Sequence, residues 1–580
     1  MERSAVAFDL ETADKDLRWV YGTGFVRLAG IQADTDLTAA STTDIGHVVE
    51  RLRDADVLVG HNILGFDLIA LQREFPDRVD VLEWAFTKDI RDTLIRARLA
   101  DPPASLRKKG PLKAYDLDSV GERLLGYGKS GDVSDMAKRH GGFDRIPLDN
   151  PEYNDYVRRD TEVTLRIDEA LPHDDYSRRE ARIAGIAAHI CVTGFRVDTG
   201  LIPVRVKQDR ERKLELMALL EERFGVVSRD TKGKPAKTLN TAVGRVSLAK
   251  GFKRLGVTRT PPKTPSGLYA TGKDAMEEMA ELWGHLPGID ELTHTVTEAT
   301  SRTFAESLEK CVVGDRVHPS INIGLSTGRW SSSTPNLLGV GKRGGKVRER
   351  DVFLAEPGHV LLTVDLSQVD ARAVAALSGD PAYIALFEPG KDAHAMIADM
   401  VFGDVGMRDT GKPLHHSFNY GASPEKLAKI ASRPGHRVPV SIAEQFWTAM
   451  HDLFPGVTKW RDAVREEAAS GALLDNGFGR LMRPDPDRAW TQGPALMGQG
   501  CARDLMMEGL LNIPLDILRM LRAIVHDEVV LSVPEQDAEE IEHEVIRALS
   551  FHWVAPGQSI GVDIVAEKSK KYGERWGECY

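Results

Sequence analysis

The chain has 580 residues, 42% of them hydrophobic and 28% charged, which is typical of a folded globular protein with several structural units. No apolar run of about 18 residues predicts a membrane span, and the first residues enter a strand pattern without the features of a signal peptide. We therefore expect a soluble, cytoplasmic protein with no membrane partner. Its four cysteines are widely spaced, which excludes a zinc site of paired cysteines, so any metal must bind oxygen ligands.

Basic residues cluster in two segments, although the formal net charge is −11. A nucleic-acid-binding surface is expected to be basic, whereas a solvated surface is the plainer interpretation of either cluster. The residues are Lys232, Lys234, Lys237, Arg245, Lys250, Lys253 and Arg254 in one segment and Lys342, Arg343, Lys346, Arg348 and Arg350 in the other.

The order of sequence patterns predicts an α/β domain followed by a longer, mostly helical region. Residues 1 to about 173 alternate strand-like and helical runs. Long helical patterns follow at 177–191 and 203–224, and the Gly, Pro, Lys and Thr-rich segment 228–274 predicts loops between helices. Strands return at HVLLTVDL and AIVHDEVVLSV, on either side of a helical block at about 380–470.

Acidic residues of the first domain fall where strands and helices meet. In AVAFDLET, Asp9 and Glu11 lie two apart on a strand and project from one face. In HNILGFD, Asn62 and Asp67 follow an apolar strand, and Asp67 opens the next helix, where it could be only a helix cap.

The run YVRRD adds Tyr156 and Asp160, which are four apart and therefore share a helical face. Four converging carboxylates repel one another unless cations neutralise them, which implies two Mg²⁺ ions. Such a metal pair can cleave a phosphodiester, with Tyr156 orienting the attacking water. These motifs resemble the tyrosine-bearing proofreading exonucleases of the DEDD superfamily. The resemblance implies a ribonuclease H-like 3′→5′ exonuclease domain at 1–173, with Asn62 contacting DNA.

A second pair of carboxylates lies in the C-terminal region. The strand 359–365 ends at Asp365, and the following turn carries Gln368 and Asp370 before a helix begins. In AIVHDEVVLSV, His526 and Asp527 stand at the tip of a predicted hairpin, although such acids could merely close the turn. Together, Asp365 and Asp527 provide the ligands that two-metal nucleotidyl transfer needs.

The run RDTGKPLHHSFNYG places four side chains at intervals of four residues, on one face of a helix. These are Arg408, Lys412, His416 and Tyr420. The two cations would meet a triphosphate, and the two rings would lie beside sugar and base. A basic amphipathic surface helix is the alternative interpretation.

Six ordered motifs resemble the family-A DNA polymerases of bacteriophage type across essentially the whole chain. They are TGRWSSSTPNL, DLSQVDAR, DAHAMIADMVFG, R-x3-K-x7-YG, QGCARD and VHDEVVL. The resemblance implies an α/β multidomain protein, in which the exonuclease domain is followed by a right-hand polymerase at 174–580. We expect a thumb at about 200–320, a palm at 321–380 and 475–580, and fingers at 381–474.

The family resemblance also assigns roles to single residues. The side chains that would track the minor groove of the primer–template end are Arg329, Asn336, Gln499 and His526. His394 would join Arg408 and Lys412 at the phosphates, and Gln368 and Asp370 would bind the nucleotide. The chain departs from the family at three positions: Asp370 replaces the usual glutamate that excludes ribonucleotides, His416 replaces phenylalanine or tyrosine, and Pro413 should bend or delay the helix.

The resemblance implies a monomeric, Mg²⁺-dependent enzyme, with Mn²⁺ as a possible substitute and two ions per active site. Its partners would be primer–template DNA, dNTPs, a single-stranded 3′ end in the exonuclease site and other replisome proteins, in the host cytoplasm if a phage encodes it. Two alternatives stay open, a single-subunit RNA polymerase-like enzyme and a replisome scaffold whose catalytic sites have decayed.

Overall fold

The computed structural model describes most of the chain. The residues that it leaves undescribed are 1–3, 17–23, 35, 104–113, 129–130, 231, 235, 237, 260, 265, 302, 342–347 and 433–437. Four members of the expected basic clusters therefore lie outside the described residues: Lys237, Lys342, Arg343 and Lys346.

Backbone contacts divide the chain into two compact units. The first unit comprises Met1–Arg196, Arg316–Leu338 and Leu354–Tyr580, and the second comprises Val197–Asp315 and Gly339–Phe353. Along the described stretches of both units, no helix is long and apolar enough to cross a lipid bilayer.

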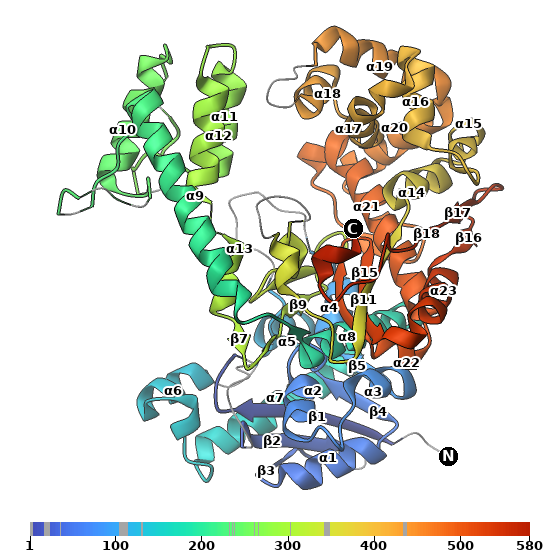
Figure 1. Cartoon of the computed structure of the whole chain (residues 1–580). Helices are drawn as coiled ribbons and strands as arrows, with labels where there is room; N and C mark the ends of the chain where they lie inside the picture. The colour runs from blue at the N-terminus through green and yellow to red at the C-terminus, as the bar shows by residue number, and fades with distance from the viewer. Residues whose placement is uncertain are drawn as a thin grey trace. The chain divides into compact units, whose positions relative to one another are not determined.

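The N-terminal part of the first unit is built on a five-stranded mixed sheet (Figure 1). Its strands are β1 (Ala5–Thr12), β2 (Val26–Ala33), β3 (Ala40–Thr42), β4 (Val57–Gly60) and β5 (Asp89–Asp92). They lie in the order β3-β2-β1-β4-β5, antiparallel among β3, β2 and β1 and parallel from β1 through β4 to β5. With helices around this sheet, the α/β character predicted for these residues is confirmed.

Capping and close packing explain how the long helix of this part is placed. The helices are α1 (Ile45–Asp54), α2 (Asp67–Glu74), α3 (Val81–Thr87), α4 (Thr93–Ala100), α5 (Leu117–Leu125), α6 (Val133–His140) and α7 (Pro151–Ala170). The Asn150 side chain accepts the N–H of Glu152 at 2.9 Å, and Pro151 begins α7. The helix packs on β1 and β2. Gly30 permits this packing, because a Cβ there would lie 2.5 Å from the Val157 carbonyl oxygen.

A four-stranded antiparallel sheet lies in the C-terminal part of the first unit. Its strands are β14 (Leu521–Val525), β15 (Glu528–Pro534), β11 (His359–Leu366) and β18 (Ala566–Glu567), in that order. The helices beside it are α14 (Val369–Ser378), α21 (Ala489–Leu511), α22 (Leu515–Leu518) and α23 (Ala538–Leu549). The α23 helix packs on β11 and β15, whereas α21 packs on α14 and α23. The expected strand and hairpin are thus confirmed, with β11 ending one residue later than predicted.

A helical block connects the strands of this sheet. It comprises α15 (Pro381–Ile384), α16 (Ala393–Phe402), α17 (Arg408–Asn419), α18 (Pro424–Ala431), α19 (Val440–Leu453) and α20 (Pro455–Ala469). The short strands of the unit are β6 (Phe195–Arg196), β8 (Arg316–Val317), β9 (Ser320–Asn322), β10 (Ser331–Ser333), β12 (Leu474–Asp475), β13 (Leu481–Met482), β16 (Phe551–Trp553) and β17 (Val562–Ile564). Pro413 lies inside α17 without ending it, so Arg408 and Lys412 share one helix, and Tyr420 is its C-terminal cap.

The second unit is mainly helical and corrects one expectation. Its elements are α9 (Leu201–Phe224), α10 (Ala242–Arg254), α11 (Lys273–Trp283), α12 (Ile289–Thr300), α13 (Phe304–Glu309) and the short strand β7 (Val312–Val313). The segment 228–274 was expected to form loops but contains α10, so that prediction was wrong there. The Gly, Pro, Lys and Thr-rich composition suggested loops, whereas Gly244 and Gly251 allow close packing of α10: an added Cβ would lie 2.6 Å from the Leu239 carbonyl oxygen and from Val226 Cγ2, respectively.

Helix α8 (Asp175–Thr193) is joined to α21 by a buried group of charges. The Glu180 carboxylate, 1% exposed, accepts hydrogen bonds from Arg503 and Arg480, each at 2.6 Å. Burial by itself raises the pKa of Glu180, but the two guanidinium groups outweigh it and hold that pKa below its ordinary value. Glu180 is therefore buried as a carboxylate.

The second carboxylate of this group, Asp504, belongs to α21. It accepts hydrogen bonds from Arg179 at 3.0 Å, Tyr176 at 2.8 Å and Asn476 at 2.5 Å. Burial opposes ionisation of Asp504, yet Arg503 and Arg480 keep its pKa well below the ordinary value. We call Glu180, Asp504 and the arginines at 179, 480 and 503 the ion cluster.

Replacing Glu180 by alanine should destabilise the protein strongly, because two buried guanidinium groups lose their shared partner. We expect a loss of about 3–5 kcal/mol in the free energy of unfolding, measured by urea titration at pH 7. The matched control is Glu544→Ala, which removes only the exposed pair with Arg547 and should cost about 0–1 kcal/mol. Equal effects of the two changes would contradict a stabilising role of the ion cluster.

Candidate active sites

Strand β1 carries the first two candidate carboxylates. Asp9 lies opposite Gly30 and Glu11 opposite Leu28 in the antiparallel pairing with β2. Residues two apart on a strand project from the same face, as the sequence predicted. Glu11 is buried and Asp9 is partly exposed, so this face of β1 offers carboxylate oxygens at the edge of the domain core.

Asp67 is held against the same strand. It is the first residue of α2, and its Oδ1 accepts the N–H of Leu10, which lies between Asp9 and Glu11, at 3.1 Å. Burial raises the pKa of Asp67 to about 8, despite the lowering effect of its backbone hydrogen bonds. Asp67 is therefore more than a helix cap, because its side chain bonds to β1 rather than only to its own helix.

Helix α7 brings Tyr156 and Asp160 to these carboxylates. Both side chains are buried on one face of the helix. Burial raises the pKa of Tyr156 far above its ordinary value, and the negative charges of Asp160, Glu11 and Asp9 raise it further. The pKa of Tyr156 thus responds to three of the predicted carboxylates, and the bond to Leu10 holds Asp67 against the strand that carries two of them.

Sequence reasoning missed Asp92 in this site. Its carboxylate accepts the N–H groups of Asn62 at 3.0 Å and Leu64 at 3.1 Å, and it also caps α4. Asn62, expected to contact DNA, has a left-handed backbone with φ 63°, which is unfavourable for a non-glycine residue. Asp92 thus fixes the loop between β4 and α2. The available signal in the sequence was an aspartate between a strand and a helix. That pattern predicts a helix cap, but it does not reveal a hydrogen-bond partner in a distant loop.

The donor atoms of this site fit a hard divalent cation. The candidate ligands Asp9, Glu11, Asp67 and Asp160 are all carboxylates, the oxygen donors that Mg²⁺ prefers. Across the described residues, no three His, Cys, Asp or Glu side chains are already gathered as a metal-binding set. Mutual repulsion keeps carboxylates apart when no cation lies between them. The fit to Mg²⁺ therefore rests on the type of donor atom and not on a preformed arrangement of the ligands.

Asp365 and Asp527 meet at one end of the second sheet. Asp365 on β11 lies opposite Glu528 of β15, and the N–H of the next residue, Leu366, donates to the Asp527 carbonyl oxygen at 2.9 Å. Both aspartates are partly exposed, whereas Glu528 is buried and accepts a hydrogen bond from the Tyr580 hydroxyl. The backbone pairing therefore brings the two predicted aspartates to the same accessible end of the sheet.

Unfavourable backbone conformations occur on both sides of this pair. Gln368, which precedes α14, has φ 53°, and His526, which precedes Asp527, has φ 62°. Among described non-glycine residues, positive φ values are found at these two, at Asn62 and at Thr334. Strained residues persist where surrounding structure holds them, and they concentrate at functional sites.

Asp370 on α14 links two other predicted residues. Its Oδ1 accepts hydrogen bonds from Arg329 at 2.6 Å and from the Tyr420 hydroxyl at 3.0 Å. Burial and the Asp370 charge raise the pKa of Tyr420 well above its ordinary value, so its hydroxyl stays protonated and donates. The shorter acid at 370 therefore reaches the tyrosine that ends α17.

Helix α17 gathers cations near His394 of α16. Arg408 donates to Asp392 at 2.7 Å, and Asp392 also caps α16. Burial lowers the pKa of His394 to about 4, and Lys412 and Arg408 lower it further, while Asp392 opposes this effect. The charges of Lys412 and Arg408 thus act on His394.

His416 is exposed and lines a pocket. Its ring meets that of Tyr420 edge to face, with centroids 5.1 Å apart. The pocket has a volume of about 470 Å³, and its wall is formed by His416, Ser417, Tyr420, Ala422, Lys426, Ile430, Arg488, Thr491, Gln492 and Ala495. The other two groove candidates are Asn336, which is exposed after β10, and Gln499, which is half-buried on α21.

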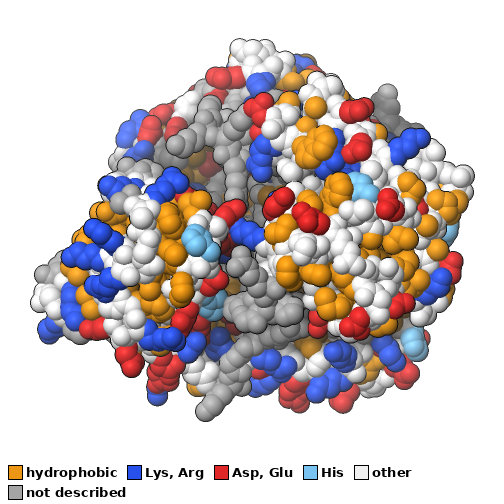
Figure 2. Space-filling view, turned by 90° about the horizontal axis from the view of Figure 1, so that it is seen from above, with side chains coloured by type: hydrophobic (Ala, Val, Ile, Leu, Met, Phe, Trp, Pro, Cys, Tyr) orange, Lys and Arg blue, Asp and Glu red, His pale blue; other side chains and the backbone are white. Residues whose placement is uncertain are grey.

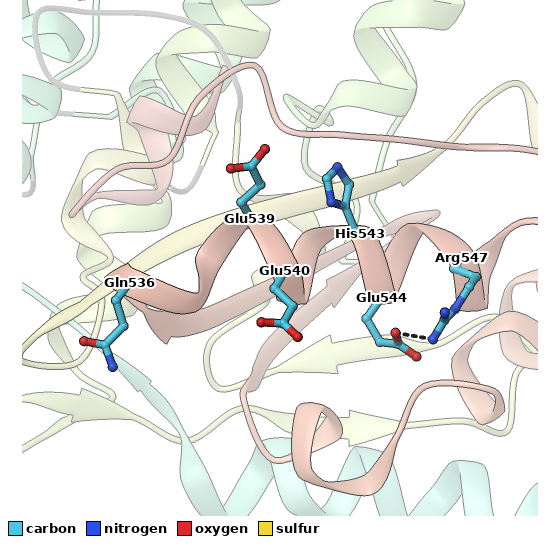
Figure 3. Close-up of a pocket in the computed structure, with 6 residues that line it drawn as sticks. All are labelled: Gln536, Glu539, Glu540, His543, Glu544 and Arg547. Atoms are coloured by element: carbon cyan, nitrogen blue, oxygen red, sulfur yellow. Dashed lines mark hydrogen bonds and ion pairs between the residues drawn. The ribbon is translucent and has the colours of Figure 1, made fainter.

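A hollow on α23 is larger but has a different character (Figure 3). Its volume is about 540 Å³, and none of the candidate residues line it. Glu539 and His543 point to one side of the helix while Glu540 and Glu544 point to another, and Glu544 pairs with Arg547. Because these side chains diverge, the hollow is a charged helix surface rather than a catalytic centre.

Known proteins resemble this chain over its full length. At 25% identity, the DNA polymerase of Mycobacterium phage D29 aligns with 100% of this chain and 94% of its own. DNA polymerase I of Rhizobium leguminosarum is 26% identical over 84% of this chain, which spans about half (48%) of that relative's length. One solved structure shares the fold: the POL domain of Pol1 from M. smegmatis in complex with DNA primer-template and dNTP. The TM-score is 0.71 at 19% identity, and the match covers 100% of this chain and 96% of that one. The model of DNA polymerase family A matches residues 248–578, more than half of the 580. The chain therefore belongs to DNA polymerase family A.

Proposed function

We propose that this protein is a template-directed DNA polymerase that extends a primer with dNTPs. The observation that carries the proposal is the pairing of β11 with the β14–β15 hairpin, which brings Asp365 and Asp527 to the same end of one sheet. These two carboxylates would hold two Mg²⁺ ions, which supply a lowered pKa for the primer 3′-hydroxyl and neutralise the triphosphate. Mn²⁺ fits the same oxygen donors. Membership of family A supports this assignment.

The residues around the carboxylates would bind and orient the substrates. Arg408, Lys412 and His394 form one polar group, which suits a triphosphate. Asp370 bonds to Tyr420 and Arg329, and this triad would border the sugar, next to His416 and Gln368. The residues that we assign to the minor groove of the primer–template are Arg329, Asn336, Gln499 and His526.

We further propose 3′→5′ proofreading by the N-terminal part of the first unit. The mixed sheet order β3-β2-β1-β4-β5, with its first three strands antiparallel, supports a ribonuclease H-like domain at 1–173. Asp9, Glu11, Asp67 and Asp160 would hold the metal pair, Tyr156 would orient water, and Asn62 would contact a single-stranded 3′ end. The electrostatic coupling of Tyr156 to three of these carboxylates supports a common site.

The second unit would act as the thumb of the polymerase. Lys232, Lys234, Lys250 and Lys253 are exposed on it. Figure 2 shows Lys and Arg side chains spread among hydrophobic ones over the face seen from above, at the left where α10–α12 lie. This basic surface would face duplex phosphates, so binding should weaken as salt rises. The proposal also includes a palm at 321–380 and 475–580 and fingers at 381–474. We further propose that the protein is a monomer with other replisome proteins as partners.

The two alternatives predict different products. An RNA polymerase-like enzyme would prefer rNTPs, and a decayed scaffold would neither extend nor shorten a labelled primer. The match to the DNA polymerase family argues against an RNA polymerase-like enzyme. The retention of every expected carboxylate argues against a decayed scaffold. Incubation of a labelled primer–template with Mg²⁺ tests both, because we expect extension with dNTPs and shortening without them.

The double change Asp9→Ala and Glu11→Ala should abolish primer shortening and leave extension within about two-fold, because the polymerase carboxylates lie on another sheet. Asp365→Ala should lower extension by at least about 10³-fold, through loss of metal-assisted catalysis, and leave shortening intact. Gel analysis of both reactions provides the measurement. Loss of both activities in either folded variant would refute two separate sites.

Asp67 should make metal-free stability depend on pH. Because its folded pKa is raised to about 8, its contribution to stability is full below the ordinary pKa of 3.8 and is lost as pH rises towards 8. In EDTA, the Asp67→Asn protein should therefore lose less stability than wild type between pH 5 and 8. Thermal unfolding checks this, and parallel pH curves for the two proteins would show that Asp67 ionises normally.

Asp370 should guard the sugar pocket despite its short side chain. Asp370→Ala removes the acceptor of Tyr420 and Arg329, so ribonucleotide incorporation should rise relative to dNTP by roughly ten-fold or more. Asp370→Glu keeps the acid and should discriminate at least as well as wild type. Single-nucleotide kinetics give the ratio of kcat/KM for dNTP and rNTP, and an unchanged ratio in the alanine variant would remove Asp370 from sugar selection.

A further inference from the structure

Two buried arginines of α20 reach the end of α17 that carries Tyr420. Nη1 of Arg461 donates to the Phe418 carbonyl oxygen at 3.0 Å, and its guanidinium lies 4.7 Å from the centre of the Phe418 ring. Nη2 of Arg465 donates to the Gly421 carbonyl oxygen at 3.4 Å. The exposed fractions of the two arginines are 1% and 7%. Arg461 and Arg465 are called the arginine clamp below.

The clamp meets the negative end of α17. The last carbonyl groups of a helix lack partners within it, and the helix dipole gives this end a partial negative charge that cations stabilise. The residue after Tyr420 makes the approach possible. Gly421 has φ 76°, and an added Cβ there would overlap Nη2 of Arg465. The two carbonyl groups that the clamp binds therefore flank Tyr420 in the chain.

Arg465 also binds the first turn of α21. Its Nε donates to the Trp490 carbonyl oxygen at 2.8 Å, and its guanidinium lies 4.0 Å from the centre of the Trp490 ring. Since α21 packs on α14, which carries Asp370, the clamp connects both partners of the bond between Tyr420 and Asp370.

His451 of α19 fixes the direction of the Arg461 guanidinium. A guanidinium group only donates, so Nη2 of Arg461 donates to Nε2 of His451 at 3.0 Å. The proton of the neutral imidazole is then on Nδ1, which lies 3.0 Å from the Thr458 hydroxyl. Burial lowers the pKa of His451 to about 4, and Arg461 lowers it further, so the ring is neutral near pH 7.

Arg461 is an expensive residue for packing alone. Burial lowers its pKa to about 10, so the side chain is still charged near pH 7, and its Nε atom is buried without a hydrogen-bond partner. A buried charge and an unsatisfied donor both oppose folding, whereas an apolar side chain would fill the same space without these costs. The arginine is therefore best explained by what it holds.

We propose that Arg461 and Arg465 are positioning residues that fix the end of α17, so that the Tyr420 hydroxyl stays on Asp370 and the nucleotide sugar is selected. This inference rests on the proposed polymerase function. The clamp itself does not touch the substrate in this proposal, because its donors are occupied by backbone carbonyl groups and by His451.

The local effect of the clamp can be measured without enzymatic activity. In hydrogen–deuterium exchange followed by mass spectrometry, the amides of residues 417–422 should exchange roughly 2- to 12-fold faster in Arg461→Met, the effect of one lost hydrogen bond. The matched control is Lys459→Met, which removes an exposed cation from the same helix and should leave this exchange unchanged. Unchanged exchange in Arg461→Met, or equal acceleration in both variants, would overturn the inference.

Sugar selection provides the second test. In single-nucleotide kinetics, Arg461→Met should raise rNTP incorporation relative to dNTP by roughly 2- to 12-fold, measured as the ratio of kcat/KM values, and Lys459→Met should not. With Tyr420→Phe as background, Arg461→Met should have no further effect, because the hydroxyl through which it acts is gone. Additive changes in the ratio would overturn the inference.

A second variant covers the case in which Arg461→Met does not fold. Arg465→Lys keeps the charge but loses the fork that reaches Gly421 and Trp490, and the same increases in exchange and in rNTP use are expected. Wild-type exchange and selectivity in that variant would contradict the clamp. If the wild-type protein extends no primer, the proposed function fails instead, and the exchange measurement still decides whether the clamp fixes the end of α17.

Discussion

The ion cluster is the interaction on which the first unit depends. Glu180 and Asp504 are charged and almost inaccessible to water, and three arginines surround them. Removing one member leaves the opposite charges buried with fewer partners, which costs stability. It fixes α21 against α8, and α21 in turn packs on α14, whose first turn carries Asp370. Sites that are distant in the sequence are thereby placed on one rigid framework.

The sequence predicted those parts of the fold and sites that depend on local pattern. Apolar runs predicted β11 and the hairpin at His526, and four-residue spacing predicted the shared face of Tyr156 and Asp160. The α10 helix was missed because glycine lowers helix propensity, whereas here two glycines serve close packing. Propensity scales hold no information about which neighbour approaches a position.

Residues whose importance comes from long-range contacts could not be predicted. Asp92 resembles any helix cap until its bonds to Asn62 and Leu64 are seen. Pro413 was expected to bend or delay its helix, and α17 runs through it from Arg408 to Asn419. A proline costs one backbone hydrogen bond and a local clash, and tertiary packing of α17 outweighs that cost.

Gly498 of α21 shows how closely this helix is fitted against the residue that caps α17. A Cβ at this position would lie 2.6 Å from the Tyr420 ring, which reaches past it to bond with Asp370. The identity of a residue on one helix thus restricts the ring position at the end of another. Proteins that diverge from this chain can exchange glycine at 498 only together with Tyr420. The two positions are therefore expected to vary as a pair.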